Sequence, residues 1–580
     1  MKTGKHQIQK LVTLILAIAM LTPMVFTHSK AQEGAEEPIG NRIDAYYEAN
    51  KNTAAGMQMA VFDNNGIIHK GYYGYADIKN QIPVDESTVI DWGSSTKTLV
   101  WVSVMQLWEQ GKIDLNADIK AYLPDGFLSN LSYEKPITMI DLMNHRAGFQ
   151  EYYTDIFIPV DESYLSLEQA LLQDPPPQIF EPDTITAYSN WGVALAGYIV
   201  ERISGESFCD YVHQHIFAPL NMNNTALAPD LSDNPKVKQK RNELVCYAGT
   251  KPLGTAFYMI QLYPAGSCVS TLDDYIAYAS CFVKDEFPLF ENQSTFDVMM
   301  SATSYFGNSN VAKNAHGFWA LRYGSNTWGH GGNTAGCSSY IYFDTQKKLG
   351  AVVMTNQAGE QTFNDYMMEL VFGESPWKYD APNQLPSNMV RPARTILKGH
   401  CKIAGEGFLK VNTFQNMLWT YNENNGIPKI ENAYGDYYFV SAGEVIPGLI
   451  AVFGLAAAVL FSLIVLIFKL IIKIIRIVKK NNIQSAEKWS VLSAFIQLLI
   501  GISAIAILIL ITGWFKSTTY LWLFKAIAIL GITLAFLAIH GLIYTYKNWK
   551  QTSFKIKLYH LATILFSILT VFTIIYEHIW

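Results

Sequence analysis

Four long stretches without a charged side chain, near the carboxyl end, constrain this chain more than any other feature. Each is long enough to cross a bilayer, which takes about 20 apolar residues in a helix. Backbone groups inside a bilayer cannot bond to water, so such stretches form helices. The pattern predicts an all-α transmembrane domain at 445–580, with four helices at about 446–468, 490–514, 521–546 and 558–576.

Lysine and arginine are distributed unevenly among the loops between these helices. The second loop holds only Lys516 before the next span. The first and third loops are strongly basic, with Lys469, Lys473, Arg476, Lys479, Lys480 and Lys488 in the first and Lys547, Lys550, Lys555 and Lys557 in the third. Basic loops stay on the cytoplasmic side. The domain that precedes Val445 is therefore predicted to lie outside the cell, on a multi-pass protein of the cell membrane.

The amino end has the pattern of an export signal. Lys2, Lys5 and Lys10 precede an apolar stretch at 11–26, and Ser29-Lys30-Ala31 places small residues where a signal peptidase cleaves. We expect a signal peptide at 1–31. An uncleaved anchor is the alternative, and both interpretations send the following domain across the membrane.

Charge and cysteine content exclude several functions. A net charge of −6 over 580 residues gives no basic surface for nucleic acid. The six cysteines show no C-x-x-C spacing, so neither a zinc site nor another metal or cofactor is predicted. They are Cys209, Cys246, Cys268, Cys281, Cys337 and Cys401. Outside the cell they can form disulfides, and free buried thiols are an equally good interpretation.

The exported part is predicted to be an α+β domain at 32–375. The apolar runs 57–62 and 67–75 flank Asn64-Asn65-Gly66, which is a strong hairpin signal. The runs 339–343 and 349–355 predict a second hairpin, followed by a helix at 362–372. Strands at both ends with helices between them indicate an antiparallel sheet that joins both termini of the domain. Residues 376–444 carry no motif and are a linker or a small accessory module.

The first chemical motif is Ser94-Ser95-Thr96-Lys97, directly before an apolar helix at 99–108. Ser94 and Lys97 are three residues apart, so a helix places them on one face. A serine hydroxyl needs a base to become a nucleophile. Lys97 can be that base if burial and neighbouring positive charge lower its pKa. The alternative is a helix cap with a solvated lysine.

The second motif is Tyr188-Ser189-Asn190, ahead of an apolar helix at 191–199. A tyrosine that faces a serine can relay protons, and an asparagine amide can hold a lysine and a substrate carbonyl. The alternative is that Asn190 only caps the helix.

The third motif is Trp328-Gly329-His330-Gly331-Gly332-Asn333, before the second hairpin. Consecutive glycines let a substrate approach the backbone closely. The alternatives are a bulge or turn for the glycines and a surface position for His330.

In order and spacing the three motifs resemble those of the serine β-lactamases and penicillin-binding proteins, specifically the class C β-lactamase-like branch. S-x-x-K matches Ser94 and Lys97, Y-x-N matches Tyr188 and Asn190, and H-x-G matches His330 and Gly332. The resemblance covers about 43–372. It implies a bacterial protein with the β-lactamase/transpeptidase-like fold, an antiparallel sheet with a helical subdomain between its end strands.

The resemblance also implies roles for the motif residues. Ser94 would form an acyl-enzyme, Lys97 would activate it, and Tyr188 would pass protons to the leaving group. Asn190 would orient Lys97 and the substrate. His330, Gly331, Gly332 and Asn333 would border the substrate, with the N–H groups of Ser94 and Asn333 as the oxyanion hole.

His330 stands where class C β-lactamases have a lysine, and a histidine is only partly charged near neutral pH. The expected function is a membrane-anchored hydrolase of cell-wall or D-amino-acid peptides, esters or β-lactams, with peptidase or esterase activity favoured. The expected substrate is a small molecule or peptide, and no protein partner is predicted.

Two other functions account for the four membrane helices. A receptor would bind cell-wall fragments or β-lactams and pass the signal inward. A transporter would use intramembrane charges, and the spans lack paired charges.

Overall fold

The computed structural model describes residues 37–151, 156–173, 175–307, 309–375, 390–392, 420–422, 429–439, 442–478, 488–512 and 517–576. The expected signal peptide at 1–31 and Cys401 lie outside the described residues. So do most of residues 376–428.

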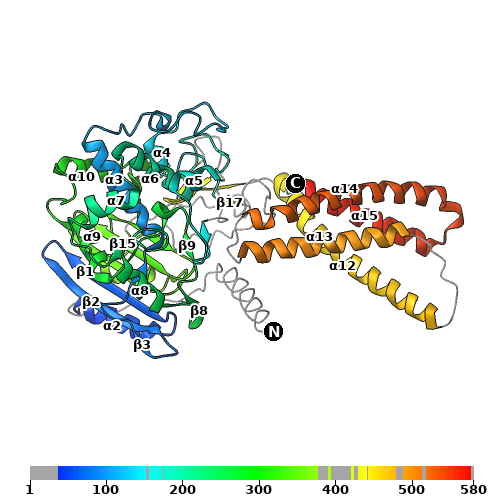
Figure 1. Cartoon of the computed structure of the whole chain (residues 1–580), viewed down its shortest axis with the longest axis horizontal. Coiled ribbons are helices and arrows are strands. Elements are labelled where there is room, and N and C mark those ends of the chain that lie inside the picture. The colour runs from blue at the N-terminus through cyan, green and yellow to red at the C-terminus, as the bar shows by residue number, and fades with distance from the viewer. Residues whose placement is uncertain are drawn as a thin grey trace.

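In the described residues that precede the four long helices, an antiparallel sheet of nine strands forms the centre of the domain (Figure 1). Its order is β11-β12-β13-β14-β15-β16-β1-β2-β3. In chain order the strands are β1 (Gly56–Asp63), β2 (Gly66–Asp77), β3 (Ile82–Pro83), β11 (Ser304–Tyr305), β12 (Ala312–Ala315), β13 (Phe318–Ala320), β14 (Thr327–Asn333), β15 (Ser338–Asp344) and β16 (Leu349–Thr355).

Strands from the two ends of the domain meet in the middle of this sheet. β1 pairs with β16 from Met57 opposite Thr355 to Asp63 opposite Leu349. β1 also pairs with β2 across the Asn64-Asn65-Gly66 turn, and β15 pairs with β16. Both predicted hairpins and the sheet that joins the domain termini are therefore confirmed.

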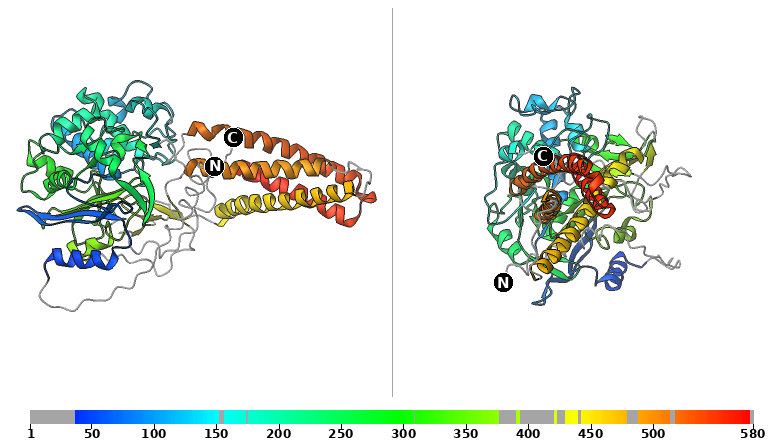
Figure 2. Two further views of the ribbon diagram at one scale, coloured as in Figure 1. Left: turned by 60° about the horizontal axis from the view of Figure 1, so that its bottom comes forward. Right: turned by 90° about the vertical axis from the view of Figure 1, so that its right-hand side faces the viewer.

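Both faces of the sheet are covered, which explains why β1 is buried along nearly its whole length. Ala60 and Phe62 face the core that the sheet shares with the helical region. Met57, Met59 and Val61 face a second core on the opposite side. That second core is closed by α2 (Ile39–Asn50) and α11 (Glu369–Phe372). Figure 2 shows α2 and the helical region on opposite sides of the sheet.

The helical region lies between β3 and β11 in the chain. Its α-helices are α3 (Lys97–Glu109), α4 (Met139–Met143), α5 (Leu167–Gln173), α6 (Asn190–Ser204), α7 (Phe208–Val212), α8 (Pro235–Glu243), α9 (Leu272–Ala279) and α10 (Gln293–Met299). Short turns of tighter or wider helix are η1 (Gly93–Thr96), η2 (Ile119–Tyr122), η3 (His213–Phe217), η4 (Tyr263–Ala265) and η5 (Ser280–Val283). Three small sheets complete it, β4 (Ile90–Asp91) with β10 (Val269–Ser270) and β6 (Thr225–Ala226), β5 (Phe157–Ile158) with β9 (Met259–Ile260), and β7 (Val245–Ala248) with β8 (Lys251–Thr255).

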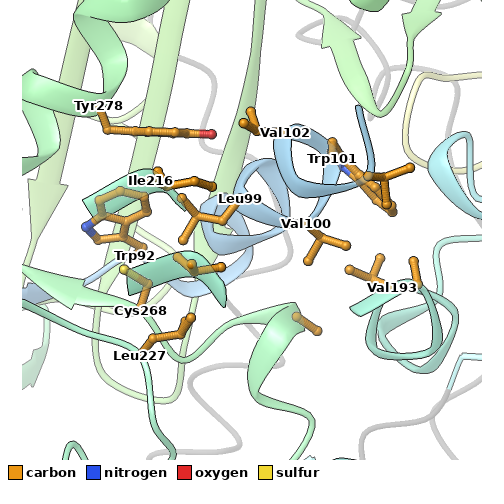
Figure 3. Packing of buried hydrophobic residues seen from close by; sticks show 14 of the residues in the cluster. Trp92, Leu99, Val100, Trp101, Val102, Val193, Ile216, Leu227, Cys268 and Tyr278 are labelled. Atoms are coloured by element: carbon orange, nitrogen blue, oxygen red, sulfur yellow. The ribbon is translucent and has the colours of Figure 1, made fainter. Parts of the chain in front are cut away.

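Helix α3 runs through the middle of this region. Its residues from Lys97 to Leu107 are all buried, so the helix is covered on every side rather than along one stripe. Figure 3 shows Leu99, Val100 and Trp101 on this helix, with Val193 of α6 and Trp92 packed nearby. The first residue of this buried helix is Lys97.

The helix predicted at 362–372 is shorter than expected. The structure has only η6 (Tyr366–Met368) and α11 in this range. The buried carboxyl group of Glu360 accepts hydrogen bonds from the N–H groups of Phe363 and Asn364. Those bonds hold the first residues of the range in a turn.

Beyond the domain, the described residues contain a small sheet and four long helices. The sheet has the order β17-β20-β19-β18, with β17 (Val390–Pro392), β18 (Thr420–Asn422), β19 (Lys429–Glu431) and β20 (Tyr437–Phe439). The helices are α12 (Ala442–Val478), α13 (Lys488–Thr512), α14 (Ser517–Lys547) and α15 (Phe554–Tyr576), with the short η8 (Trp549–Gln551) before the last. Each long helix contains a segment long and apolar enough to cross a membrane.

The four helices lie side by side (Figure 1). A buried polar contact joins three of them. Gln497 of α13 accepts a hydrogen bond from Ser462 of α12, and its amide donates to Ser567 of α15 at 2.9 Å. Such bonds between apolar helices contribute roughly 0.6–2 kcal/mol each.

The five described cysteines, Cys209, Cys246, Cys268, Cys281 and Cys337, are free thiols. Of the two interpretations made from sequence, free thiols therefore hold for these five. Cys246 and Cys337 are the near pair, with 3.9 Å between their sulfur atoms.

Five phenylalanines from separate elements form an aromatic cluster that we expect to be a main source of stability. Phe282 is fully buried and stacks on Phe343 with 4.5 Å between ring centroids. The other phenylalanine rings beside it are Phe287, Phe296 and Phe318, and the ring of Tyr278 also contacts it. We predict that Phe282→Ala lowers the free energy of unfolding by about 3–5 kcal/mol because it leaves a cavity.

Thermal unfolding of the full chain in detergent, followed by near-ultraviolet circular dichroism, measures this loss. The matched control is Tyr305→Ala, because Tyr305 is 48% exposed and surface changes usually stay within about 0.5 kcal/mol. Equal melting temperatures for the two variants would contradict the role of the cluster.

Candidate active site

Ser94 lies in η1, the tight turn that leads into α3. The preceding residue, Gly93, has a φ of +54°, in the left-handed region that favours glycine. A side chain there would also meet the backbone of Asn333, since a Cβ atom would lie 2.7 Å from the Asn333 nitrogen. Glycine therefore allows η1 to pack backbone to backbone against β14.

Lys97 is completely buried one helical turn beyond Ser94. Its Nζ lies 3.0 Å from Ser94 Oγ. It also lies 2.6 Å from Asn190 Oδ1 and 2.6 Å from the carbonyl oxygen of Ala265. Burial lowers the pKa of Lys97 to about 7, while the nearby Glu151 carboxylate acts in the opposite direction. Burial thus does what we predicted, and the predicted neighbouring positive charge is not among the causes of the shift.

These contacts orient a neutral Lys97 amine. A neutral amine has two N–H bonds and one lone pair. When the two N–H bonds donate to Asn190 Oδ1 and the Ala265 carbonyl, the lone pair remains for Ser94. The arrangement lets Lys97 accept the proton of the Ser94 hydroxyl.

Tyr188 approaches the same hydroxyl from another side. Its OH group donates a hydrogen bond to Ser94 Oγ at 2.7 Å. Its ring lies 4.9 Å from Lys97 Nζ, measured to the centroid, and 4.4 Å from the ring of His145. Burial lowers the pKa of His145 well below its usual value, so this neighbour is neutral. Ser94 Oγ is therefore within hydrogen-bonding distance of two groups that exchange protons.

Asn190 is the first residue of α6, but its side chain does not cap the helix. Ser189 is the cap, because its Oγ accepts a hydrogen bond from Gly192 N–H at 3.0 Å. The amide nitrogen of Asn190 donates to Glu151 Oε1 at 3.2 Å, and its backbone N–H donates to Glu151 Oε2 at 2.6 Å. Glu151 therefore turns the Asn190 oxygen toward Lys97, and the interpretation of Asn190 as a mere cap is wrong.

The third motif is strand β14, not a turn or bulge. A Cβ atom at Gly332 would lie 1.8 Å from the Trp92 carbonyl oxygen and 2.9 Å from the Ser94 nitrogen. Together with the close approach of Gly93 to Asn333, this contact places the backbone nitrogens of Ser94 and Asn333 where η1 packs on β14. Two N–H groups so arranged can stabilise an oxyanion.

The side chain of His330 is buried inside the protein and does not occupy a surface position. It is fully buried, and its ring stacks on Trp319 with 3.9 Å between centroids. Its Nδ1 lies 2.7 Å from the Gly331 carbonyl oxygen. Burial and the nearby Lys97 lower the pKa of His330 to about 3. The expectation of a partly charged imidazole is therefore wrong, because His330 is neutral near neutral pH.

A cavity of about 360 Å³ opens beside Ser94. Tyr188, Asn190, Gly331 and Asn333 line it together with Ser94. Apolar groups from β5 and β9 close one part of it, namely Phe157 and Ile260 with the adjoining Ile156. Trp319, Asn432, Ala433 and Tyr434 are also in its lining.

The sequence alone does not identify Glu151, Asn432 or Tyr434 as site residues. Glu151 follows the 137–149 segment of the family resemblance by two positions, and that proximity was its only signal. Asn432 and Tyr434 lie in the segment that carries no motif, and nothing in the sequence indicated them.

Residues 42–372 match the family model described as Beta-lactamase. Penicillin-binding protein 4* of Bacillus subtilis (strain 168) is 27% identical over 167 residues, covering 28% of this chain and 36% of that protein. Protein flp of Staphylococcus aureus (strain MRSA252) is 20% identical over 322 residues, covering 54% of this chain and 62% of that protein.

Among solved structures, the D-amino acid amidase from Ochrobactrum anthropi SV3 complexed with D-phenylalanine is similar. It is 23% identical with a TM-score of 0.48, and the match covers 58% of this chain and 98% of that one. The chain spans between about a third and two thirds of the length of the two curated relatives named above.

The Lys97 environment predicts how the reactivity of Ser94 depends on pH. Lys97 accepts a proton only when it is neutral, so modification of Ser94 by a fluorophosphonate should accelerate as pH rises through about 7. The Glu151 carboxylate raises the pKa of Lys97, so Glu151→Gln should move the midpoint to lower pH.

The rate of fluorophosphonate labelling of the full chain, measured across neutral pH, tests both points. Glu86→Gln is the control, since Glu86 is an exposed acid outside the site. A midpoint that stays in place or rises in Glu151→Gln would contradict the assignment of Lys97 as the titrating group.

Proposed function

Because the chain belongs to the beta-lactamase family, we propose that it is a membrane-anchored serine hydrolase that works through an acyl-enzyme at Ser94. One observation carries the proposal. Ser94 Oγ lies 3.0 Å from the Nζ of a buried Lys97 and 2.7 Å from the OH of Tyr188. A nucleophile between a base and a second proton carrier is the arrangement that acyl transfer requires.

The reaction follows from these distances. Lys97 takes the proton of Ser94 as Oγ attacks the substrate carbonyl carbon. The N–H groups of Ser94 and Asn333 stabilise the negative charge that develops on the carbonyl oxygen. Tyr188 passes a proton to the leaving group, whose bond to the carbonyl carbon then breaks. Water releases the acyl group from Ser94 by the same steps in reverse order.

The neutral state of His330 favours one class of substrate. A lysine at this place would offer a cation to a substrate carboxylate. His330 has a pKa of about 3 and offers none. We therefore place D-amino-acid amides and esters, which need not carry a carboxylate beside the reacting bond, ahead of β-lactams and of peptides that end in a free carboxylate.

The proposed location is the outer face of a bacterial cell membrane. It is supported by the basic loops at 469–488 and 547–557, the signal-like residues 1–31, and four helices of membrane-spanning length. In this arrangement the hydrolase occupies 32–375, residues 376–444 connect it to the membrane domain, and 445–580 cross the bilayer.

We predict that a fluorescent penicillin or a fluorophosphonate labels the chain covalently at Ser94. Ser94→Ala should lose the labelling, and Tyr188→Phe should keep the fold while turnover falls by about 10²–10⁴-fold. Peptide mapping of the labelled protein locates the adduct. Labelling that persists in Ser94→Ala, with turnover unchanged, would sink the proposal.

A hydrolysis panel on the full chain then separates the substrate classes. It compares nitrocefin, D-Ala-D-Ala peptides, D-amino-acid amides and p-nitrophenyl esters with Ser94→Ala as the blank. The neutral His330 predicts that nitrocefin and the D-Ala-D-Ala peptides, which both carry a carboxylate, are hydrolysed more slowly than the amides and esters. A receptor instead of an enzyme would give an acyl adduct that persists in an intact-mass measurement without turnover.

The orientation has its own test. A protease added to intact cells should remove the domain before Val445 and leave the loops at 469–488 and 547–557 uncut. Cleavage of those loops in sealed cells would reverse the topology.

A further inference from the structure

Residues 429–439 form a short segment between the hydrolase domain and the first long helix. We call it the juxtamembrane segment. It consists of β19, the connection 432–436 and β20, and α12 begins three residues after its end. By sequence it lies far from the catalytic motifs, yet it packs against the residues that precede Tyr188.

One end of the segment is held by a buried ion pair. Asp436 and Lys313 are both fully buried, with 3.8 Å between Oδ1 and Nζ. The Asp436 Oδ2 accepts the N–H of Thr186 at 3.0 Å, and the Asp436 N–H donates to the Thr186 carbonyl at 2.8 Å. Gly435 pairs with Ala187 in an antiparallel bridge. The backbone directly before Tyr188 is thus bonded to this segment.

The other end is held by the connection between β11 and β12 and by β12 itself. Glu431 Oε2 accepts the N–H of Gly307 at 2.5 Å. The amide of Asn314 donates to the Ala433 carbonyl at 3.0 Å. With Asp436, these bonds fix both sides of the connection between β19 and β20. The connection between β19 and β20 is therefore fixed to the domain by specific hydrogen bonds.

This connection forms one wall of the cavity that contains Ser94. Asn432, Ala433 and Tyr434 line the cavity. The Tyr434 ring lies 5.6 Å from the ring of Trp319, which lies 6.2 Å from the ring of Tyr188. The wall is therefore aromatic, and it is on the Tyr188 side of Ser94.

Because this wall lies on the Tyr188 side of Ser94, its position indicates which part of the substrate contacts it. In the proposed reaction Tyr188 hands a proton to the leaving group, so the leaving group extends toward Tyr188. The flat faces of Trp319 and Tyr434 suit a ring, because aromatic groups stack favourably. An aliphatic leaving group of one carbon would not reach such contacts.

We propose that Tyr434 of the juxtamembrane segment is a specificity-determining residue of the hydrolase, and that it selects substrates with an aromatic leaving group. This inference rests on the acyl-enzyme function proposed for Ser94. It makes the chain next to the membrane a part of the active site.

The test uses the full chain in detergent and two esters of one acid, with benzyl and methyl leaving groups. Their kcat/KM values are measured by competition against fluorophosphonate labelling of Ser94. Comparing variants with the natural chain cancels the intrinsic reactivity of the two esters. Tyr434→Ala should lower the benzyl-to-methyl ratio about tenfold, and Tyr434→Phe should keep it within about twofold because the ring remains.

Tyr305→Ala is the matched control, since it removes an exposed tyrosine that does not line the cavity. It should leave the ratio unchanged. A ratio in Tyr434→Ala equal to or above that of the natural chain, or no competition by either ester, overturns the inference if Ser94 is still labelled. Absence of labelling in the natural chain counts against the proposed function instead, so the two failures are distinguishable.

Discussion

The site depends on the burial of the Lys97 side chain. An isolated ammonium group away from water is costly, and a protein lowers that cost by making the amine neutral. The neutral amine still needs partners for its N–H bonds, and Asn190 and the Ala265 carbonyl supply them. Each later feature of the site either holds one of those partners or uses the lone pair that they leave toward Ser94.

Gly93 and Gly332 allow the backbone of the helical region to approach the backbone of the sheet closely at the site. In the proposed reaction the nucleophile belongs to the helical region and one oxyanion donor to the sheet, so the two backbones must touch. Side chains at either glycine would collide with the opposite backbone, at 2.7 Å for Gly93 and 1.8 Å for Gly332. The contact also fixes α3 against the sheet, so catalytic geometry and domain packing rest on the same few atoms.

Patterns within a few consecutive residues were enough to predict the sheet and the motifs. The Asn64-Asn65-Gly66 turn and the order of the three motifs required no knowledge of distant contacts. The neutral state of His330 could not be predicted this way, because it arises from burial, to which the stacked Trp319 on another strand contributes, and from the nearby Lys97. Glu151 holds Asn190, 39 positions later, and raises the pKa of Lys97, while Asp436 bonds to Thr186 across 250 positions. Local patterns carry no signal of such pairings.

The juxtamembrane segment connects the wall of the cavity to the first long apolar helix through a short stretch of chain. Tyr434 lines the cavity, and eight peptide steps later Ala442 begins α12. Even a fully extended chain of that length spans at most about 28 Å. The cavity wall and the start of the first long helix are therefore held close together. A substrate that reaches Ser94 in the proposed arrangement does so near the bilayer surface.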